Sequence, residues 1–433
     1  MDKKVITIIV AAFIAIAILS AFFVMDDEEK DKNTPPKVLI NHPKGGNDVS
    51  SIVMISGTAY DPDDGYENSL VRIWIDGEWH TADGFGQWSY EWNTFDVNDG
   101  TYTIKAQAHD GISYSTIDSV TVTVDNVESV ETNSHKWAVF VAAANSAPEE
   151  NKKLGNGGLH LSEDMASYFI ENYGYPTDNI FILFDDGWLR RNNGYGERFV
   201  TLQEREHEYD INYGSATRSS VKSVISHVVE KANQYEDSEV FLWFFGHGLG
   251  DSSKELTGGK LLQRSAIFLW DGKLTDEQLG GWLSGLNAKE SCIVVDACYS
   301  GGFADKTILN LPEMFLFRSD LSSSGRVIIS GASKFREGYA STESGPLFTL
   351  LWFDGIKTGK ADGFKPWVFN LGRKTRLDIF KDGKVSVEEA FYYASYNLRK
   401  NKDLDYFSGM HPQINDMYPD KGFFRNNDGL ILG

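Results

Sequence analysis

The sequence predicts an α/β domain with a mostly parallel sheet between helices, preceded by a smaller all-β sandwich and by one hydrophobic N-terminal helix. Three observations indicate this order. Residues 5–24 are almost wholly apolar, short strand-like runs fill residues 37–126, and from residue 136 onward apolar runs alternate with amphipathic helices. Alternation of strands and helices is typical of a parallel sheet covered by helices.

The composition bounds the class of protein. With 433 residues, of which 41% are hydrophobic, the chain is long enough for two or three domains. Its formal net charge of −21 excludes nucleic acid as an expected partner, because phosphate binding requires a basic surface. The two cysteines, Cys292 and Cys298, fall on one predicted strand. Their separation of about 20 Å is too large for a disulfide, so neither thiol is expected to cross-link the fold.

The first apolar stretch, Val5–Val24, has the length of a membrane span. At about 1.5 Å rise per residue it extends roughly 30 Å, the thickness of the hydrocarbon core of a bilayer. Lys3 and Lys4 precede it and acidic residues follow it, which by the positive-inside rule leaves the rest of the chain outside the cytoplasm. Residues 1–25 are predicted to be a single-pass cell-membrane anchor, followed by a polar linker at 26–36. A cleaved signal segment is the alternative, and the protein would then be secreted.

Residues 37–126 are predicted to form an immunoglobulin-like β-sandwich. Short alternating or β-branched runs recur there between Asp-Gly turns, and such closely spaced short strands are typical of this fold. No cysteine pair falls in this region, so tryptophans are expected to supply core mass instead. The predicted strands are 38–41, 51–59, 70–75, 88–92, 101–108 and 119–124, and the tryptophans are Trp74, Trp79, Trp88 and Trp92.

An acidic turn in this region has two interpretations. Asp61, Asp63 and Asp64 lie within four residues of one another. Clustered carboxylates suit a calcium ion at the edge of the domain. A solvated turn explains the same residues without a metal.

A linker at 127–135 leads into the α/β region, residues 136–433. Its short, continuous apolar runs are typical of parallel strands buried on both faces. The charged, Gly-rich segment 190–213 is expected to be a long surface loop. Since crossover connections are right-handed, helices are expected on both faces of the sheet. The predicted strands are 137–143, 180–184, 239–245, 266–270, 292–297 and 327–333, and the predicted helices are 160–173, 217–234, 275–286 and 387–398.

Two of these strands end in residues that carry chemistry. The run 239–245 is followed by Gly246, His247 and Gly248, and the run 292–297 is followed by Cys298. Open α/β sheets bind ligands outside the carboxyl ends of their strands. An imidazole beside a thiol at that edge makes a thiolate usable near neutral pH. The backbone N–H groups of Gly248 and Cys298 are the expected donors to an oxyanion.

The alternative for each residue is structural, because an isolated cysteine is most often a small buried hydrophobe and an isolated histidine a core residue. Two glycine-flanked motifs at strand ends favour catalysis, with Cys298 as nucleophile and His247 as general base and acid. Cys292 lies inside its predicted strand and is expected to be structural.

The motifs around these residues also resemble a known family. FFGHG at 244–248 and VVDACYSGG at 294–302 resemble the signatures of the caspase-like cysteine peptidases, and within that clan the chain resembles the legumain family most. The likeness continues over residues 160–186. It also covers residues 327–340, which are similar to the strand and loop that wall the specificity pocket.

The resemblance implies a caspase-like fold for residues 136–433 and cysteine-type endopeptidase activity on peptide or protein substrates, without a cofactor. It implies that Ser333 and Glu337 lie at the specificity pocket. Glu337 and Glu343, which follow the fifth strand, are the candidates for an acidic substrate-binding group there. An acidic pocket made by either glutamate is expected to prefer Arg or Lys in the substrate. Ordinary surface glutamates are the alternative.

Three positions depart from the legumain pattern. Leu159 stands where that family has a pocket arginine, and Tyr299 stands where it has a glutamate after the nucleophile. Both changes remove polar groups that a pocket for asparagine needs, so strict asparaginyl specificity is not expected. Asn156, the residue that would orient His247, is displaced by one position.

The carboxyl region holds one further pattern, at 378–389. Its residues have the offsets of a calcium-binding loop, but Phe380 occupies a ligand position and cannot coordinate. An Asp-Gly turn followed by a helix that Ser386 and Glu389 cap explains the same residues. The capped helix is the prediction.

The function predicted from the sequence is that of an extracytoplasmic cysteine endopeptidase behind a sandwich spacer. One alternative is a transpeptidase or amide ligase that passes the same acyl-enzyme to an amine. Another is a surface adhesion protein without catalytic activity, against which the intact His247 and Cys298 argue.

Overall fold

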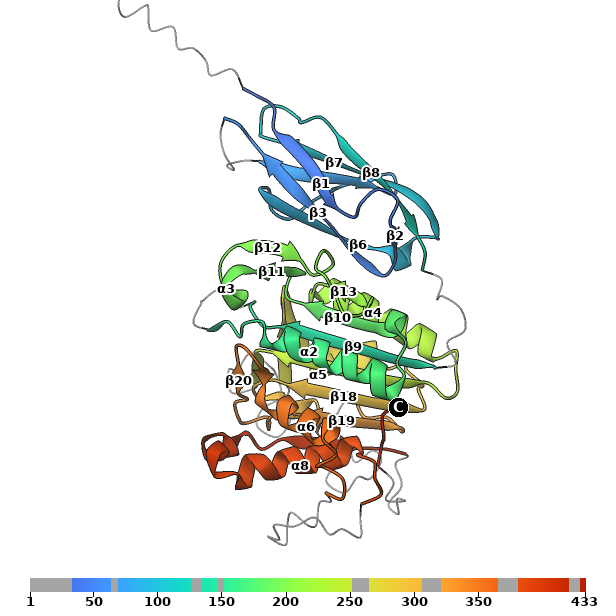
Figure 1. Ribbon diagram of the computed structural model, residues 1–433, viewed down its shortest axis with the longest axis vertical. Helices are drawn as coiled ribbons and strands as arrows, with labels where there is room; N and C mark the ends of the chain where they lie inside the picture. The colour runs from blue at the N-terminus through green and yellow to red at the C-terminus, as the bar shows by residue number, and fades with distance from the viewer. Residues whose placement is uncertain are drawn as a thin grey trace, which may run out of the picture. The chain divides into compact units, whose positions relative to one another are not determined.

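The computed structural model describes residues 33–63, 69–126, 134–146, 152–250, 265–305, 321–364, 381–419 and 429–433 (Figure 1). The predicted membrane anchor at 5–24 lies outside these residues. Within the described ranges, no helix is both long enough and apolar enough to cross a membrane.

The N-terminal β region consists of two sheets. One has the order β1 (Lys37–His42), β3 (Ile52–Tyr60), β6 (Gln87–Asn93). The other has the order β2 (Asp48–Val49), β8 (Asp118–Val124), β7 (Gly100–His109), β4 (Leu70–Ile75), β5 (Glu78–Thr81). All six predicted strands are present, whereas the short strands β2 and β5 were not predicted. The pairing of β4 with β5 places Trp74 opposite Trp79 across a tight Asp-Gly turn.

Only two of the four tryptophans enter the core, so this part of the prediction was half wrong. Trp88 and Trp92 are buried. Trp74 and Trp79 lie on the outer surface of their sheet, where Lys105 Nζ sits 4.2 Å from the ring centroid of Trp74. Cations over aromatic faces stabilise such exposed rings.

The acidic turn is described only in part, because Asp64 lies outside the described residues. Asp61 is buried and accepts a hydrogen bond of 3.0 Å from the backbone N–H of Asp63. This contact closes a turn of the kind that aspartates favour. Calcium binding stays a prediction.

A seven-stranded sheet forms the centre of the α/β region (Figure 1). All neighbouring strands pair in parallel except the last, which runs antiparallel to its neighbour. Across the sheet the strands are β13 (Asn212–Gly214), β10 (Ile180–Phe184), β9 (Lys136–Ala143), β14 (Glu239–Gly246), β18 (Glu290–Asp296), β19 (Arg326–Ser330) and β22 (Gln413–Asp416). Every residue of β14 is buried, which explains why its sequence is apolar without alternation.

Helices cover both faces of this sheet, as predicted. The first face carries α2 (Gly157–Tyr168), α6 (Leu347–Lys357) and α8 (Val387–Lys400). The second face carries α4 (Arg218–Ala232) and α5 (Asp276–Trp282). The sheet is therefore buried between two layers of helices, and chemistry is left to the ends of the strands.

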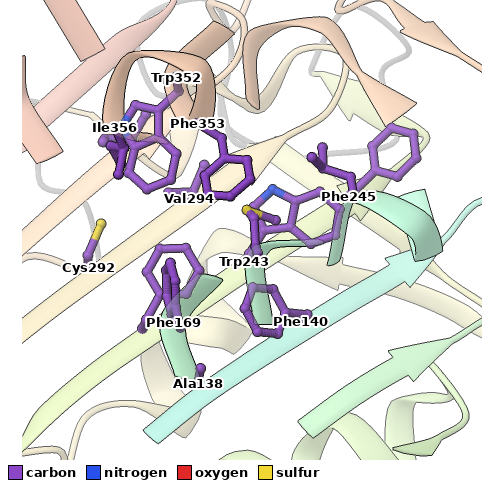
Figure 2. Packing of buried hydrophobic residues seen from close by; sticks show 14 of the residues in the cluster. Ala138, Phe140, Phe169, Trp243, Phe245, Cys292, Val294, Trp352, Phe353 and Ile356 are labelled. Carbon is purple, nitrogen blue, oxygen red and sulfur yellow. The ribbon is translucent and has the colours of Figure 1, made fainter. Parts of the chain in front are cut away.

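Alternate residues of the strands supply the two cores. Trp243 belongs to the core under α2, α6 and α8, whereas Leu242 belongs to the core under α4 and α5. Figure 2 shows Trp243 near Phe140, and their ring centroids lie 6.4 Å apart. Cys292 lies in the same core and is fully buried, as expected of a structural residue.

Three elements differ from the prediction. The strand expected at 266–270 is β16 (Ser265–Leu269), which belongs to a separate antiparallel sheet with β15 (Gly248–Gly250) and β17 (Gly272–Thr275). The expected loop 190–213 begins at the last residue of β11 (Trp188–Arg190), which forms a hairpin with β12 (Arg198–Thr201), and it ends in the edge strand β13. Helix α6 was not predicted because its sequence, LFTLLWFDGIK, is apolar around most of its circumference and so lacks a helical period.

The predicted cap at the start of α8 is confirmed. Ser386 accepts the N–H of Glu389, and the Glu389 side chain accepts the N–H of Ser386. The turn before it rests on Asp362, which accepts the N–H groups of Asp382 and Gly383. The calcium-loop pattern at 378–389 falls partly outside the described residues.

Candidate active site

His247 and Cys298 follow neighbouring strands at the same edge of the sheet. β14 and β18 pair in parallel with Phe245 opposite Asp296. His247 comes two positions after Phe245, and Cys298 comes two positions after Asp296. The structure therefore brings the two motifs side by side, as the sequence predicted.

The backbones of the motifs touch at Gly248. A Cβ built on this glycine would lie 1.8 Å from the carbonyl oxygen of Cys298 and 2.9 Å from its backbone nitrogen. No side chain fits in that space, so glycine is required by close approach and not by an unusual backbone angle. Phe268 holds the preceding residue by donating its N–H to the His247 carbonyl at 2.8 Å.

The imidazole of His247 is held by a hydrogen bond at Nε2. Nε2 lies 2.6 Å from the backbone carbonyl oxygen of Lys152. Since a carbonyl oxygen only accepts, Nε2 carries the hydrogen and Nδ1 keeps its lone pair in the neutral ring. Asn156 does not orient the imidazole, because its side-chain Oδ1 is buried without a hydrogen-bond partner among the described residues and the group bonded to Nε2 is the carbonyl of Lys152.

The thiol of Cys298 is half-buried and engaged by Gly338. The N–H of Gly338 donates to Sγ at 3.4 Å, and Sγ donates to the Gly338 carbonyl at 3.6 Å. Burial raises the pKa of the Cys298 thiol, the Gly338 N–H opposes this rise, and the carboxylates of Glu337 and Asp296 add to it. Among the hydrogen bonds of the described residues, none joins Cys298 to His247. These contacts favour the protonated form of the thiol.

Tyr299, directly after the nucleophile, adopts the left-handed conformation with φ of 57°. Such a backbone angle is uncommon for a residue with a side chain, and it turns the chain into the short helix Ser300–Gly302. The backbone N–H of Tyr299 donates to the Arg336 carbonyl at 2.8 Å. Its hydroxyl donates to Glu337 Oε1 at 3.3 Å.

The three predicted substrate-binding residues lie in different surroundings. Glu337 is exposed and close enough to Cys298 to affect its pKa. Glu343 is exposed in a turn whose hydrogen bonds go to Ser341, and its carbonyl lies 3.5 Å from His160 Nδ1. Ser333 is buried, and its Oγ accepts the N–H of Phe335 at 3.4 Å.

Leu159, which stands where the legumains have a pocket arginine, is fully buried and belongs to the core under α2. The expectation that strict asparaginyl specificity is absent stays a prediction.

Sequence reasoning missed the group that holds His247, which is the Lys152 carbonyl. It also missed Asn145 and Asp185, two buried residues whose side chains hydrogen-bond to each other. A signal was present, because Asn145 and Asp185 follow β9 and β10 at the carboxyl edge of the sheet, where polar residues have functional roles. A backbone carbonyl leaves no trace in the sequence.

Residues 36–106 match a family model described as a bacterial Ig domain. The immunoglobulin-like fold of this region is confirmed. The match covers only this part of the chain and leaves the α/β region unassigned. No curated protein matches the chain.

The solved structures that are similar to parts of the chain include the following three. Caspase-1 from Spodoptera frugiperda is 11% identical, with 66% of this chain and 87% of that chain covered and a TM-score of 0.37. The endo-beta-1,4-mannanase from Thermotoga petrophila is 16% identical over 24% of this chain, with a TM-score of 0.19. The fibronectin(III)-like modules of Clostridium thermocellum CbhA are 26% identical over 23% of this chain, also with a TM-score of 0.19.

The chain spans 22% of the length of the mannanase and 52% of the CbhA modules. At these TM-scores none of the three likenesses carries an argument about activity. The resemblance to legumains stays a hypothesis.

Proposed function

We propose that the chain is a caspase-like cysteine endopeptidase in which Cys298 is the nucleophile and His247 the general base and acid. The observation that carries the proposal is the contact between Gly248 and Cys298 at the ends of two paired strands. Together with the fixed Nε2 of His247, this contact supports a base and a nucleophile at one edge of the sheet.

The proposed reaction uses the side chains of Cys298 and His247 and one water molecule. His247 Nδ1 takes the proton of the Cys298 thiol, and the sulfur attacks the carbonyl carbon of the scissile peptide bond. The C–N bond breaks, the leaving amine takes the proton from the imidazolium, and a thioester remains. Water then attacks the thioester with His247 as base, which releases the carboxylic acid and restores the thiol. Backbone N–H groups at Gly248 and Cys298 are the proposed donors to the oxyanion.

Proton transfer requires a change from the resting arrangement. Sγ is held by Gly338, and burial favours the protonated form of the thiol. The sulfur has to leave Gly338 for the imidazole before it can react. We therefore expect bound substrate to activate the thiol, since a neutral thiol is a weak nucleophile.

Glu337 is the better of the two acidic candidates for substrate selection. It is tied to Tyr299, the residue after the nucleophile, and its charge acts on the thiol. Glu343 has no such link to Cys298. We propose that Glu337 favours Arg or Lys on the acyl side of the scissile bond, since a carboxylate pairs best with a cation.

The proposed location is outside the cytoplasm, at the cell membrane or secreted. Its support is the apolar stretch Val5–Val24 with lysines before it and acidic residues after it. The immunoglobulin-like domain that follows suits a spacer at a cell surface. Protease added to intact cells should degrade the chain beyond residue 25, and protection of both domains would contradict this location.

The experiment that tests the function is turnover of a peptide library by the full-length chain, with and without an amine nucleophile such as glycinamide. Cleavage that Cys298→Ala abolishes supports the endopeptidase. Products that carry the added amine would instead favour the transpeptidase. Cleavage that persists in Cys298→Ala would overturn the assignment of the nucleophile.

A further inference from the structure

Asp185 and Asn145 form a buried pair at the carboxyl ends of β10 and β9. Asp185 Oδ1 accepts the backbone N–H of Asn145 at 3.0 Å, and its Oδ2 accepts the Asn145 side-chain amide at 2.7 Å. Asp185 is 1% exposed and Asn145 is 3% exposed. Neither residue has a part in the mechanism above, yet burying a carboxylate is costly unless its hydrogen bonds are made.

Asn145 also hydrogen-bonds to the loop before α2 and so connects Asp185 to that loop. Its Oδ1 accepts the N–H of Gly155 at 2.9 Å, and its Nδ2 also donates to the Gly155 carbonyl at 3.2 Å. Gly155 has φ of 69°, a left-handed conformation that favours glycine. The N–H of Leu154 donates to the Ala144 carbonyl at 2.9 Å. One side chain therefore fixes both backbone groups of Gly155.

The same loop supplies the carbonyl that orients His247. Lys152 lies three residues before Gly155, and its carbonyl oxygen accepts Nε2–H at 2.6 Å. Because the connecting segment is so short, a displacement of Gly155 displaces this carbonyl. Asp185 is thus linked to His247 through Asn145 and the loop, without touching the imidazole.

We propose that Asp185 and Asn145 are positioning residues, which hold the Lys152 carbonyl against His247 Nε2 and so keep Nδ1 as the base. This inference rests on the proposed role of His247. It extends that role, because it explains the Nε2–H tautomer of His247 by two buried residues, Asp185 and Asn145, that follow other strands. Supporting partners of this kind orient functional histidines in many sites.

The pair requires an ionised Asp185, since both of its oxygens accept an N–H. Burial raises the pKa of Asp185 to about 7, hydrogen bonds from Asn145 oppose this rise, Asp186 adds to it and Arg190 lowers it. Asp186 in turn pairs with Arg190 and Arg198. A protonated Asp185 turns one acceptor into an O–H donor that faces the amide of Asn145. The positioning should therefore weaken as the pH falls through about 7.

The first test reads the imidazole directly, by ¹⁵N NMR of histidine-labelled full-length protein, with His247→Gln to assign the signals. At about pH 8.5, where free imidazole is neutral, the Nε2–H form should dominate at His247. Asp185→Asn should reduce the ratio of Nε2–H to Nδ1–H roughly fivefold, the effect of about one hydrogen bond. Asn145→Ser should act in the same direction, which keeps the test decisive if Asp185→Asn does not fold.

The second test is kinetic. Asp185→Asn should lower kcat roughly tenfold and leave KM within about twofold, as expected for a misplaced base. The ratio of wild-type to variant kcat should shrink toward one as the pH falls below about 7, because Asp185 is then protonated in the wild type as well. The double variant Asp185→Asn with Asn145→Asp should be more active than Asp185→Asn alone. In it the amide at position 185 can donate to the carboxylate at position 145.

Asp186→Asn is the matched control, since it removes a neighbouring buried carboxylate whose hydrogen bonds go to Arg190 and Arg198. It should leave the tautomer ratio of His247 unchanged. An unchanged ratio in Asp185→Asn, or a kinetic deficit that does not vary with pH, would overturn the proposal. Peptidase activity that survives Cys298→Ala would overturn the proposed function instead, and the NMR result would still decide the role of the pair.

Discussion

Gly248 is in backbone contact with Cys298, and a Cβ built on the glycine would lie 1.8 Å from the Cys298 carbonyl oxygen. This contact sets the separation of the histidine-bearing and cysteine-bearing segments whatever rotamers the side chains adopt. It explains why the histidine motif needs a residue without a side chain directly after His247.

A methyl group at Gly248 should separate the two motifs. We expect Gly248→Ala to lower kcat by about 100-fold or more, because displacements of about 1 Å suffice for such losses, and to destabilise the fold by roughly 1–3 kcal/mol. Peptide turnover and thermal unfolding measure the two effects. Gly272→Ala is the matched control, since a Cβ there meets nothing within 4 Å. Full activity in Gly248→Ala would show that the contact is irrelevant.

The charge of Glu337 should keep the thiol protonated. Burial raises the pKa of Cys298, and the Glu337 carboxylate raises it further. Glu337→Gln should therefore lower this pKa and speed alkylation by iodoacetamide at about pH 7 roughly threefold, with a smaller effect at high salt because Glu337 is exposed. Glu343→Gln should match the wild type. Identical alkylation profiles of Glu337→Gln and wild type would contradict the assignment.

Glu337 should also decide which substrates are cleaved. Replacement by Gln should reduce cleavage after Arg or Lys roughly fivefold, the effect of one exposed ion pair, and hardly change cleavage after neutral residues, because only a cation depends on the carboxylate. Profiling of a peptide library measures both rates, with Glu343→Gln as control. The acidic pocket is wrong if the wild type cleaves after Asn or Asp without preference for basic residues.

The stability of the α/β region should fall as the pH rises from about 4.5 to 7. Burial raises the pKa of Glu388 to about 7, and its carboxylate accepts the N–H of Leu430. The folded state therefore holds a proton that the unfolded state releases, so this stability is present below the unfolded pKa and is lost as the pH passes the folded pKa. The shift corresponds to roughly 3 kcal/mol.

Urea unfolding at a series of pH values checks this dependence. Glu388→Gln should flatten the curve because it removes one titrating group, whereas Glu277→Gln on the exposed start of α5 should not change it. A slope that is the same in wild type and Glu388→Gln would contradict the assignment to Glu388.

The sequence predicted the strands that present the site, because each is a continuous apolar run that ends in a glycine or a turn. Helix α6 escaped prediction since burial on most sides erases its period, and the 190–213 hairpin was hidden in a charged segment. The placement of His247 and Cys298 followed from two strand ends. The hydrogen bond that orients His247 could not be predicted in this way. It goes to the backbone carbonyl of Lys152, and every residue has such a carbonyl.

The burial of Leu159 could not be predicted from the motif either. Alignment of a short motif places a residue along the chain but does not say which side of α2 it faces. In the structure Leu159 points into the core, where an apolar side chain is required. Neighbouring positions on a helix differ by about 100° in direction, so a shift of one residue exchanges pocket and core.

The most direct test of the central claim is mass spectrometry of the full-length chain after reaction with an electrophilic peptidyl probe that ends in Arg. The account predicts a single covalent adduct on Cys298 and none on the buried Cys292, with labelling slowed about 100-fold or more by His247→Ala. Labelling of Cys292 instead, or a rate at Cys298 that His247→Ala leaves unchanged, would contradict a His247-activated nucleophile.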